Sequence, residues 1–255
     1  MLAVERQQRI LEIVLKSGAM TTTDAARRLK ISEETARRDF EKLEADGLLA
    51  RSHGGAVRLN DNHRDLSLGS REIECVPEKK IIAELAGRQI QTGDTVFFDA
   101  SSTVFYLARL LPNMAVTVLT TGLKIAIELA RRPAVEVILT GGNVGHRTLS
   151  CYGNLADSLL QRCHVHKAFL SCRGIDPLRG LSDPTVEQAD LKRKMMDLAE
   201  QTFMLADHSK IGVKSSWFFA KLTDVDVFIA DRKPAGSIAR AMQIAGRRII
   251  TPEVN

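Results

Sequence analysis

The stretch from Ser32 to Phe40 constrains the fold of this chain more than any other feature of its sequence. Ser32 can accept hydrogen bonds from the free N–H groups of a first helical turn, so a helix is expected to begin directly after it. Ala36, Phe40 and Leu43 then fall on one apolar stripe of that helix. The polar side chains off the stripe are Thr35, Arg37, Arg38 and Lys42. A helix with one face in a core and the other free for phosphates and base edges is typical of DNA recognition in the major groove.

The segments on either side complete a winged helix-turn-helix. A first helix is predicted over Arg6–Ser17, and a second one begins near Thr21, which can cap it. Two short strands, Leu48–Arg51 and Ala56–Leu59, are expected to pair around the turn Ser52–Gly55. Glycine supplies the positive φ that such a hairpin needs, so this hairpin is the predicted wing.

Positive charge in this module is local. Residues 1–58 contain eleven Lys and Arg against nine Asp and Glu, although the whole chain carries a formal charge of +5. A diffuse basic field is therefore not expected to locate a DNA site, and individual side chains must do so. The predicted DNA-binding residues are Thr22, Ser32, Glu34, Thr35, Arg37, Arg38, Lys42, Arg51 and His53.

Length and composition favour two domains. The chain has 255 residues, 44% of them hydrophobic, which is enough for a core in each domain. We predict a DNA-binding domain over 1–59, a polar linker over 60–76 and a second domain over 77–255. Within the linker, Arg71 and Glu72 belong either to a solvated tether or to a segment with fixed contacts. No apolar run is long enough to cross a membrane and no signal-peptide pattern opens the chain, so we expect a cytoplasmic protein.

From Pro77 onward, short apolar runs alternate with amphipathic helical segments. The expected strands are Thr95–Asp99, Ala115–Thr120, Val135–Leu139, Ala168–Ser171, Phe203–Ala206, Val225–Ala230 and Ile249–Ile250. The expected helices include Lys79–Ile90, Leu123–Arg131, Asn154–Arg162 and Val186–Gln201. This alternation predicts an α/β domain with a Rossmann-like, mostly parallel sheet covered by helices on both faces.

Polar and glycine-rich turns follow four of these strands. In parallel sheets, ligands bind at the carboxyl ends of the strands, and free N–H groups at a helix N-terminus suit a phosphate. We therefore predict an effector site formed by Asp99, Ser101, Ser102, Thr103, Thr121, Gly122, Gly141, Gly142 and Lys210. In this interpretation Asp99 accepts from a sugar hydroxyl and Lys210 adds charge to a phosphate. The alternative makes Ser102 a helix cap and leaves Lys210 solvated.

Both halves resemble the DeoR family of bacterial transcriptional regulators. The first resembles it through Arg6, Ile10, the Ser32–Phe40 pattern, Leu43, Gly47, Arg51 and His53–Ala56, and the second through residues 78–231. The resemblance implies a sensor domain related in fold to ribose-5-phosphate isomerase and a phosphorylated sugar as effector. Ser101 stands where the family pattern has a glycine, and Thr121 where it has an asparagine.

These residues fit three candidate functions to different degrees. The first is a regulator of a carbohydrate operon that binds operator DNA and responds to a phosphorylated sugar. The second is a phosphosugar isomerase with an appended DNA-binding module, for which Asp99, Glu187, Asp207 and Lys210 offer groups but no assembled catalytic set. The third, an architectural DNA protein, fits poorly with a sensor-sized second domain. We expect no enzyme activity and no catalytic residues.

No cofactor and no metal are expected. The six histidines form no zinc-binding pattern, and His164 and His166 are expected at the surface. The four cysteines form no C-x-x-C pair and are expected to be reduced thiols. One recognition helix reads too few base pairs to single out an operator in a genome, so we predict a homo-oligomer, a dimer or a tetramer.

Overall fold

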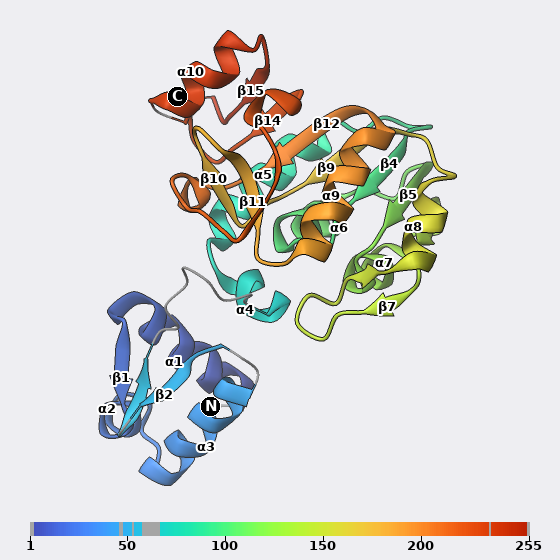
Figure 1. Ribbon diagram of the computed structural model, residues 1–255. Helices are drawn as coiled ribbons and strands as arrows, with labels where there is room; N and C mark the ends of the chain where they lie inside the picture. The colour runs from blue at the N-terminus through green and yellow to red at the C-terminus, as the bar shows by residue number, and fades with distance from the viewer. Residues whose placement is uncertain (1–2, 46–47, 53, 58–66, 235, 254–255) are drawn as a thin grey trace. The chain divides into compact units, whose positions relative to one another are not determined.

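The computed structural model describes residues 3–45, 48–52, 54–57, 67–234 and 236–253. The chain divides into two compact units, residues 1–71 and 72–255 (Figure 1). Of the predicted linker, residues 60–66 lie outside the described residues, and the remainder contains helix α4, Leu68–Ile73. Helix α4 was not predicted from the sequence.

The first unit is a winged helix-turn-helix, as predicted. Its elements are α1 (Ala3–Ser17), β1 (Ala19–Thr21), α2 (Thr22–Leu29), α3 (Glu33–Ala45), β2 (Ala50–Ser52) and β3 (Gly55–Val57). Both predicted caps are present, because Thr21 Oγ1 accepts from Asp24 N and Ser32 Oγ accepts from Thr35 N. The apolar stripe of α3 is buried in the core that the helices share with the wing.

The wing contains a third strand that the sequence did not reveal. Strand β1 pairs with β3, and β3 pairs with β2, so the sheet order is β1-β3-β2. Gly55 permits this pairing, because a Cβ atom there would lie 2.4 Å from the carbonyl oxygen of Met20. The close approach leaves room only for glycine.

Gly55→Ala is expected to destabilise the DNA-binding unit by about 1–3 kcal/mol, because overpacking forces the backbones of β1 and β3 apart. Urea unfolding followed by circular dichroism measures this effect. Gly54→Ala is the comparison for side-chain volume, since no atom of the described residues lies within 4 Å of a Cβ there, although its positive φ adds strain of its own. A Gly55→Ala protein as stable as the unmodified chain would contradict the packing described here.

The second unit is built on a parallel sheet. Its strands are β4 (Thr95–Phe98), β5 (Val116–Thr120), β6 (Val135–Leu139), β9 (Val165–Leu170), β12 (Ala199–Leu205), β14 (Val227–Ile229) and β15 (Arg248–Ile250). The order is β15-β14-β12-β9-β4-β5-β6, and each pair is parallel. The chain adds strands on one side of β4 as far as β6 and then continues from β9 on the other side, so the order reverses between β4 and β9.

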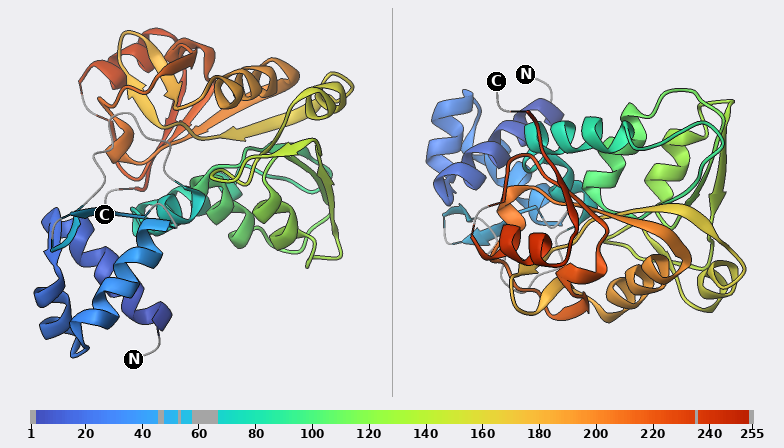
Figure 2. Two further views of the ribbon diagram at one scale, coloured as in Figure 1. Left: turned by 60° about the horizontal axis from the view of Figure 1, so that its bottom comes forward. Right: turned by 90° about the horizontal axis from the view of Figure 1, so that it is seen from above.

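Helices cover both faces of this sheet, as predicted (Figure 2). Helices α5 (Val76–Gly87), α6 (Ser102–Leu110) and α7 (Leu123–Leu129) share a core with alternate strand residues such as Val96 and Phe98. Helices α8 (Asn154–Leu160), α9 (Val186–Leu198) and α10 (Ser237–Ile244) share the opposite core with Phe97. Successive strand residues point to opposite faces, which explains why these strands read as uninterrupted apolar runs.

Two small antiparallel sheets were not predicted. Strands β7 (Asn143–Val144) and β8 (Cys151–Tyr152) pair with each other. Strands β10 (Gly174–Asp176), β11 (Gly180–Asp183) and β13 (Trp217–Ala220) form a sheet of order β10-β11-β13. Two short 3-10 helices, His208–Lys210 and Leu222–Asp224, complete the unit.

The end of one predicted helix is a strand in the structure. The sequence favours a helix as far as Gln201, but α9 ends at Leu198 and β12 begins at Ala199. Strand pairing explains the difference, because Ala199 and Gln201 pair with Val165 and Lys167 of β9. Tertiary pairing here overrides the local helix propensity of Ala199–Gln201.

All four cysteines are free thiols, as predicted. Over the part of the chain that the structure describes, none of the helices combines the length and apolar character needed to span a bilayer.

Candidate DNA-contacting helix and effector site

The solvent face of α3 presents the predicted arginines. The side chains of Arg37 and Arg38 are 56% and 76% exposed. Arg38 Nε lies 3.3 Å from Glu34, and Arg37 lies 3.8 Å from Glu33 and 3.9 Å from Glu34. Exposed pairs of this kind are worth about 0–1 kcal/mol, so DNA phosphates can replace the glutamates at little cost. Lys42 is also exposed on this helix.

Other predicted DNA contacts have structural partners. Thr22 is buried, and its hydroxyl donates to the carbonyl oxygen of Gly54 in the wing at 2.9 Å. We therefore remove Thr22 from the proposed contact set. The hydroxyls of Ser32 and Thr35 are 2.8 Å apart and stabilise the start of α3.

Arg51 ties the wing to α3. Its Nη1 donates to Glu41 at 2.9 Å and its backbone N–H to Glu44 at 2.8 Å. Its side chain remains 43% exposed, so it stays in the proposed contact set. His53 lies outside the described residues.

Helix α3 is fixed to α1 by a buried ion pair that the sequence interpretation missed. Asp39, of which 4% of the side chain is exposed, accepts from both Nε and Nη2 of Arg6, the latter at 3.0 Å. Gln7 Nε2 donates to the same carboxylate at 3.0 Å. The two-point contact fixes the orientation of α3, which carries the candidate DNA-contacting face.

In the second unit, Asp99 lies at the point where the strand order reverses. It is 1% exposed, and its Oδ1 accepts from Ser101 N at 3.0 Å while its Oδ2 accepts from Ser171 N at 2.9 Å. The carboxylate thus joins the ends of β4 and β9. These bonds give Asp99 a positioning role, and the sugar-hydroxyl contact expected from the sequence stays a prediction.

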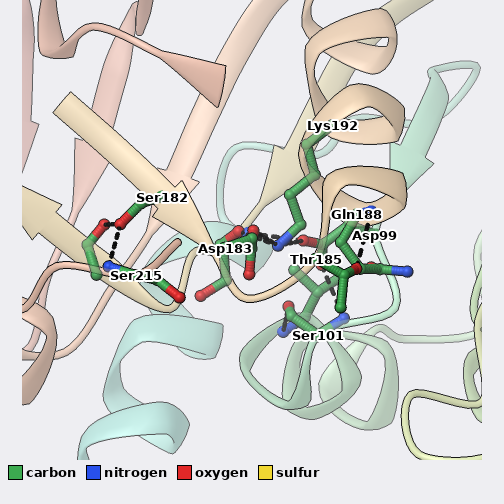
Figure 3. Close-up of polar contacts among 11 residues, drawn as sticks. Asp99, Ser101, Ser182, Asp183, Thr185, Gln188, Lys192 and Ser215 are labelled. Atoms are coloured by element: carbon green, nitrogen blue, oxygen red, sulfur yellow. Dashed lines mark hydrogen bonds and ion pairs between the residues drawn. The ribbon is translucent and has the colours of Figure 1, made fainter. Parts of the chain in front are cut away.

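A buried lysine completes this junction (Figure 3). Lys192 of α9 donates from Nζ to Ser171 O and to Asp183 Oδ2, each at 2.6 Å, and lies 3.4 Å from Asp99 Oδ2. Burial lowers the pKa of Lys192, but the two carboxylates outweigh burial and the net shift is upward. Lys192 is therefore a charged, buried tie between α9, β11 and the reversal point.

The loop after β4 begins α6 with a cap that differs from the expected one. Ser101, not Ser102, is the N-cap residue, and its Oγ accepts from Val104 N at 3.2 Å. Ser102 and Thr103 lie in the first helical turn and are buried. The helix N-terminus at this loop offers N–H groups to an anion, and the phosphate expected there stays a prediction.

Among the residues that the structure describes, two buried hydroxyls at the same end of the sheet have no hydrogen-bond partner. These atoms are Thr121 Oγ1 and Thr140 Oγ1, which follow β5 and β6. The loop after β5 touches the loop after β4, since a Cβ on Gly122 would lie 3.2 Å from the Cα of Ala100. Buried polar atoms are normally hydrogen-bonded, so two unpaired hydroxyls at the ends of the neighbouring strands β5 and β6 indicate a place for a polar ligand.

Gly141 and Gly142 follow β6 with φ of 73° and 98°. A Cβ on Gly142 would lie 2.5 Å from the carbonyl oxygen of Tyr152 in β8. Gly142 is thus required for the close approach of β8 to this loop, and its role is structural.

Charged groups gather at the loop after β12. Asp207 is fully buried; its Oδ1 accepts from Ser209 N at 2.9 Å, and its Oδ2 has no hydrogen-bond partner within the described parts of the chain. Burial raises the pKa of Asp207, but Lys210 is the first of several contacts that outweigh burial and lower it. Burial, followed by the charge of Lys210, lowers the pKa of Lys79 to about 8. Lys210 is half-buried beside these groups rather than fully solvated.

Glu78, His208 and Asp231 offer ligand atoms within 4.8 Å of one another. Asp231 accepts from His208 N at 2.8 Å and from Arg232 Nε at 2.9 Å, and His208 Nδ1 lies 2.9 Å from the same carboxylate. The donors on Asp231 hold the loop after β12 to the end of β14, so we interpret this cluster as a hydrogen-bonded junction.

The strand order sets the extent of the predicted site. The four predicted loops follow β6, β5, β4 and β12, which span five neighbouring strands, or roughly 19 Å at about 4.8 Å per strand. Sequence reasoning missed Lys192, Asp183 and Ser171, although a lysine between Leu191 and Met195 on the buried face of α9 was a usable signal.

Comparison with known proteins agrees with both halves of this description. Residues 6–62 match the family model of the DeoR-like helix-turn-helix domain, and residues 74–232 match that of the DeoR C terminal sensor domain. An HTH-type transcriptional regulator of Bacillus subtilis, YulB, is 42% identical over 91% of this chain and 90% of its own length. The L-fucose operon activator of Haemophilus influenzae is 34% identical over 89% of this chain and 91% of its own length.

Among solved structures, ribose 5-phosphate isomerase A from Methanocaldococcus jannaschii aligns with a TM-score of 0.40 and 15% identity over 53% of this chain and 54% of its own. The curated relatives named above are transcriptional regulators and not enzymes, and two family models together cover most of the chain. The chain belongs to the DeoR family of DNA-binding transcriptional regulators.

Proposed function

We propose that this protein controls a carbohydrate-utilisation operon, and that a phosphorylated sugar bound at the strand-end loops sets its affinity for operator DNA. It acts in the cytoplasm as a homo-oligomer, a dimer or a tetramer, because paired recognition helices double the number of base pairs that are read. The effector part of the proposal has its main support in the unpaired hydroxyls of Thr121 and Thr140, which follow β5 and β6, and in the N-terminus of α6, which follows the neighbouring strand β4.

The phosphate is assigned to the first turn of α6. Ser102 and Thr103 are in this turn, whereas the N–H of Val104 is already used by the Ser101 cap. The hydroxyls of Thr121 and Thr140 donate to phosphate or sugar oxygens, which removes the cost of leaving them unpaired. Lys210 supplies positive charge from the β12 side, where Lys79 adds a second amine.

Calorimetry tests the effector assignment. Ribose 5-phosphate, glucose 6-phosphate and fructose 1-phosphate are titrated into the full-length protein, with the free sugars as controls. We expect one sugar phosphate to bind, and Lys210→Ala and Thr121→Val each to weaken it by roughly 10-fold or more, since hydrogen bonds to charged groups contribute about 1.5–3 kcal/mol.

Lys233→Ala is the matched control, because it removes an equally positive but exposed side chain from the same unit. Equal affinity in the unmodified protein and in Lys210→Ala would remove Lys210 from the site. Binding of the free sugars as tightly as their phosphates would overturn the phosphate assignment.

A further inference from the structure

The first residue of the second unit is held by two helices that begin at the proposed effector loops. Glu72 directly follows Arg71, where the chain passes from one unit to the other. Both oxygens of the Glu72 carboxylate accept from Lys124 Nζ, at 2.6 and 2.7 Å. The hydroxyl of Tyr106 donates to the backbone carbonyl of Glu72 at 3.1 Å. Side chain and main chain of Glu72 are thus fixed independently.

Both holding residues lie close to the start of their helices. Lys124 is the second residue of α7, which begins directly after Thr121 and Gly122. Tyr106 is the fifth residue of α6, which begins directly after Ser101. A displacement of either first turn by a bound ligand therefore reaches Glu72 within about one and a half helical turns.

The contacts around Glu72 are partly shielded from solvent. The side chain of Glu72 is 17% exposed and that of Lys124 is 37% exposed, while Tyr106 is 8% exposed. The Lys124 ammonium also lies 5.1 Å from the centroid of the Phe105 ring, and Phe105 packs edge-on against Tyr106. An ion pair that is partly buried and held against aromatic rings has a defined geometry, unlike a solvated surface pair.

We propose that Glu72, Tyr106 and Lys124, here called the Glu72 anchor, couple the strand-end loops to the segment that leads to the DNA-binding unit. The proposal rests on the proposed function, in that those loops bind the effector. The sequence left open whether Arg71 and Glu72 belong to a solvated tether or to a segment with fixed contacts. Glu72 has fixed contacts. Its residues are positioning residues that touch neither DNA nor the proposed effector.

Coupling between two sites is reciprocal, so it can be measured from the DNA side without any effector. The probe is a DNA duplex selected from random sequences by binding to the full-length protein. Hydrogen–deuterium exchange is compared with and without this duplex. We expect DNA to change the exchange of peptides covering residues 121–126 several-fold in the unmodified protein.

The double variant Tyr106→Phe/Lys124→Met removes both contacts and keeps most of the packing. Its Kd for the duplex should lie within about twofold of that of the unmodified protein. The DNA-dependent change in hydrogen–deuterium exchange at residues 121–126 should disappear. The charge exchange Glu72→Lys/Lys124→Glu keeps an ion pair between the two positions with the charges reversed. This variant should show the DNA-dependent change in exchange at residues 121–126. Glu128→Gln breaks the pair with Arg132 at the other end of α7 and should leave the change intact.

Two results would overturn the proposal: no DNA-dependent change at 121–126 in the unmodified protein, or a full change in the double variant. No sugar phosphate enters this experiment. If calorimetry finds no effector, the result of the exchange experiment is therefore still valid. If the exchange experiment contradicts the coupling role of the Glu72 anchor, the assignment of the effector site is still valid.

Discussion

Replacing Arg37 and Arg38 together with alanine is expected to weaken operator binding by about 2–6 kcal/mol. A base-reading arginine is worth roughly 1–3 kcal/mol, and a phosphate contact is lost equally from every DNA sequence. Both side chains are well exposed and their ion pairs with Glu33 and Glu34 are weak, so the fold should be unaffected.

Fluorescence anisotropy with operator and random duplexes measures the loss and shows which arginine reads a base. The control is Arg131→Ala/Arg162→Ala, which removes the same charge from exposed positions of the second unit. Unchanged operator binding by a folded Arg37→Ala/Arg38→Ala protein would refute the assignment of α3 as the recognition helix.

Lys192→Met is expected to destabilise the second unit by about 3–5 kcal/mol. The substitution takes the Lys192 ammonium away from the buried carboxylates of Asp183 and Asp99 and takes the Lys192 donor away from the carbonyl of Ser171. Removing one partner of a buried ion pair costs this much because the remaining charge stays desolvated.

Urea unfolding of the full-length protein measures the shift of the second-unit transition. Lys194→Met is the matched control on the same helix, since Lys194 pairs with Asp157 at 2.8 Å but is 44% exposed. The control is expected to cost about 0–1 kcal/mol. If both substitutions had the same small effect, the account of Lys192 as a tie at the reversal point would be wrong.

The helices of the DNA-binding unit and the strands of the parallel sheet could be predicted from the sequence, because they depend on local patterns of apolar residues. The stripe Ala36, Phe40 and Leu43 specifies the buried face of α3, and each strand of the parallel sheet is an apolar run that lies between two helical layers. These patterns need no knowledge of distant partners.

Features that depend on distant partners were missed. The helix predicted to continue to Gln201 becomes strand β12 at Ala199 because β9 offers a pairing edge. Strands β7, β8 and β10 are only two or three residues long and carry no detectable periodicity. Strand β1 could not be predicted, because it forms only through its pairing with β3, where Gly55 lies close to Met20.

The candidate site was predicted in part. The turns after the strands could be placed, because parallel strands bring their carboxyl ends to one edge. The role of Asp99 could not, since it depends on Ser171, which is 72 residues away in sequence, and on Lys192 of α9. Likewise, only the structure shows that Glu72 meets Lys124 and Tyr106.

Operator affinity measured in the presence and absence of sugar phosphates tests the central claim most directly. We expect one phosphorylated sugar to change the Kd for operator DNA by about 5–150-fold, the usual range of coupling between two sites. Operator DNA should change the affinity for that sugar phosphate by the same factor. The Lys210→Ala protein should bind operator DNA with the same Kd as the unmodified protein. It should need a higher concentration of the sugar phosphate for the same change in operator affinity. An operator affinity that no sugar phosphate alters, in a protein that binds one, would contradict the account.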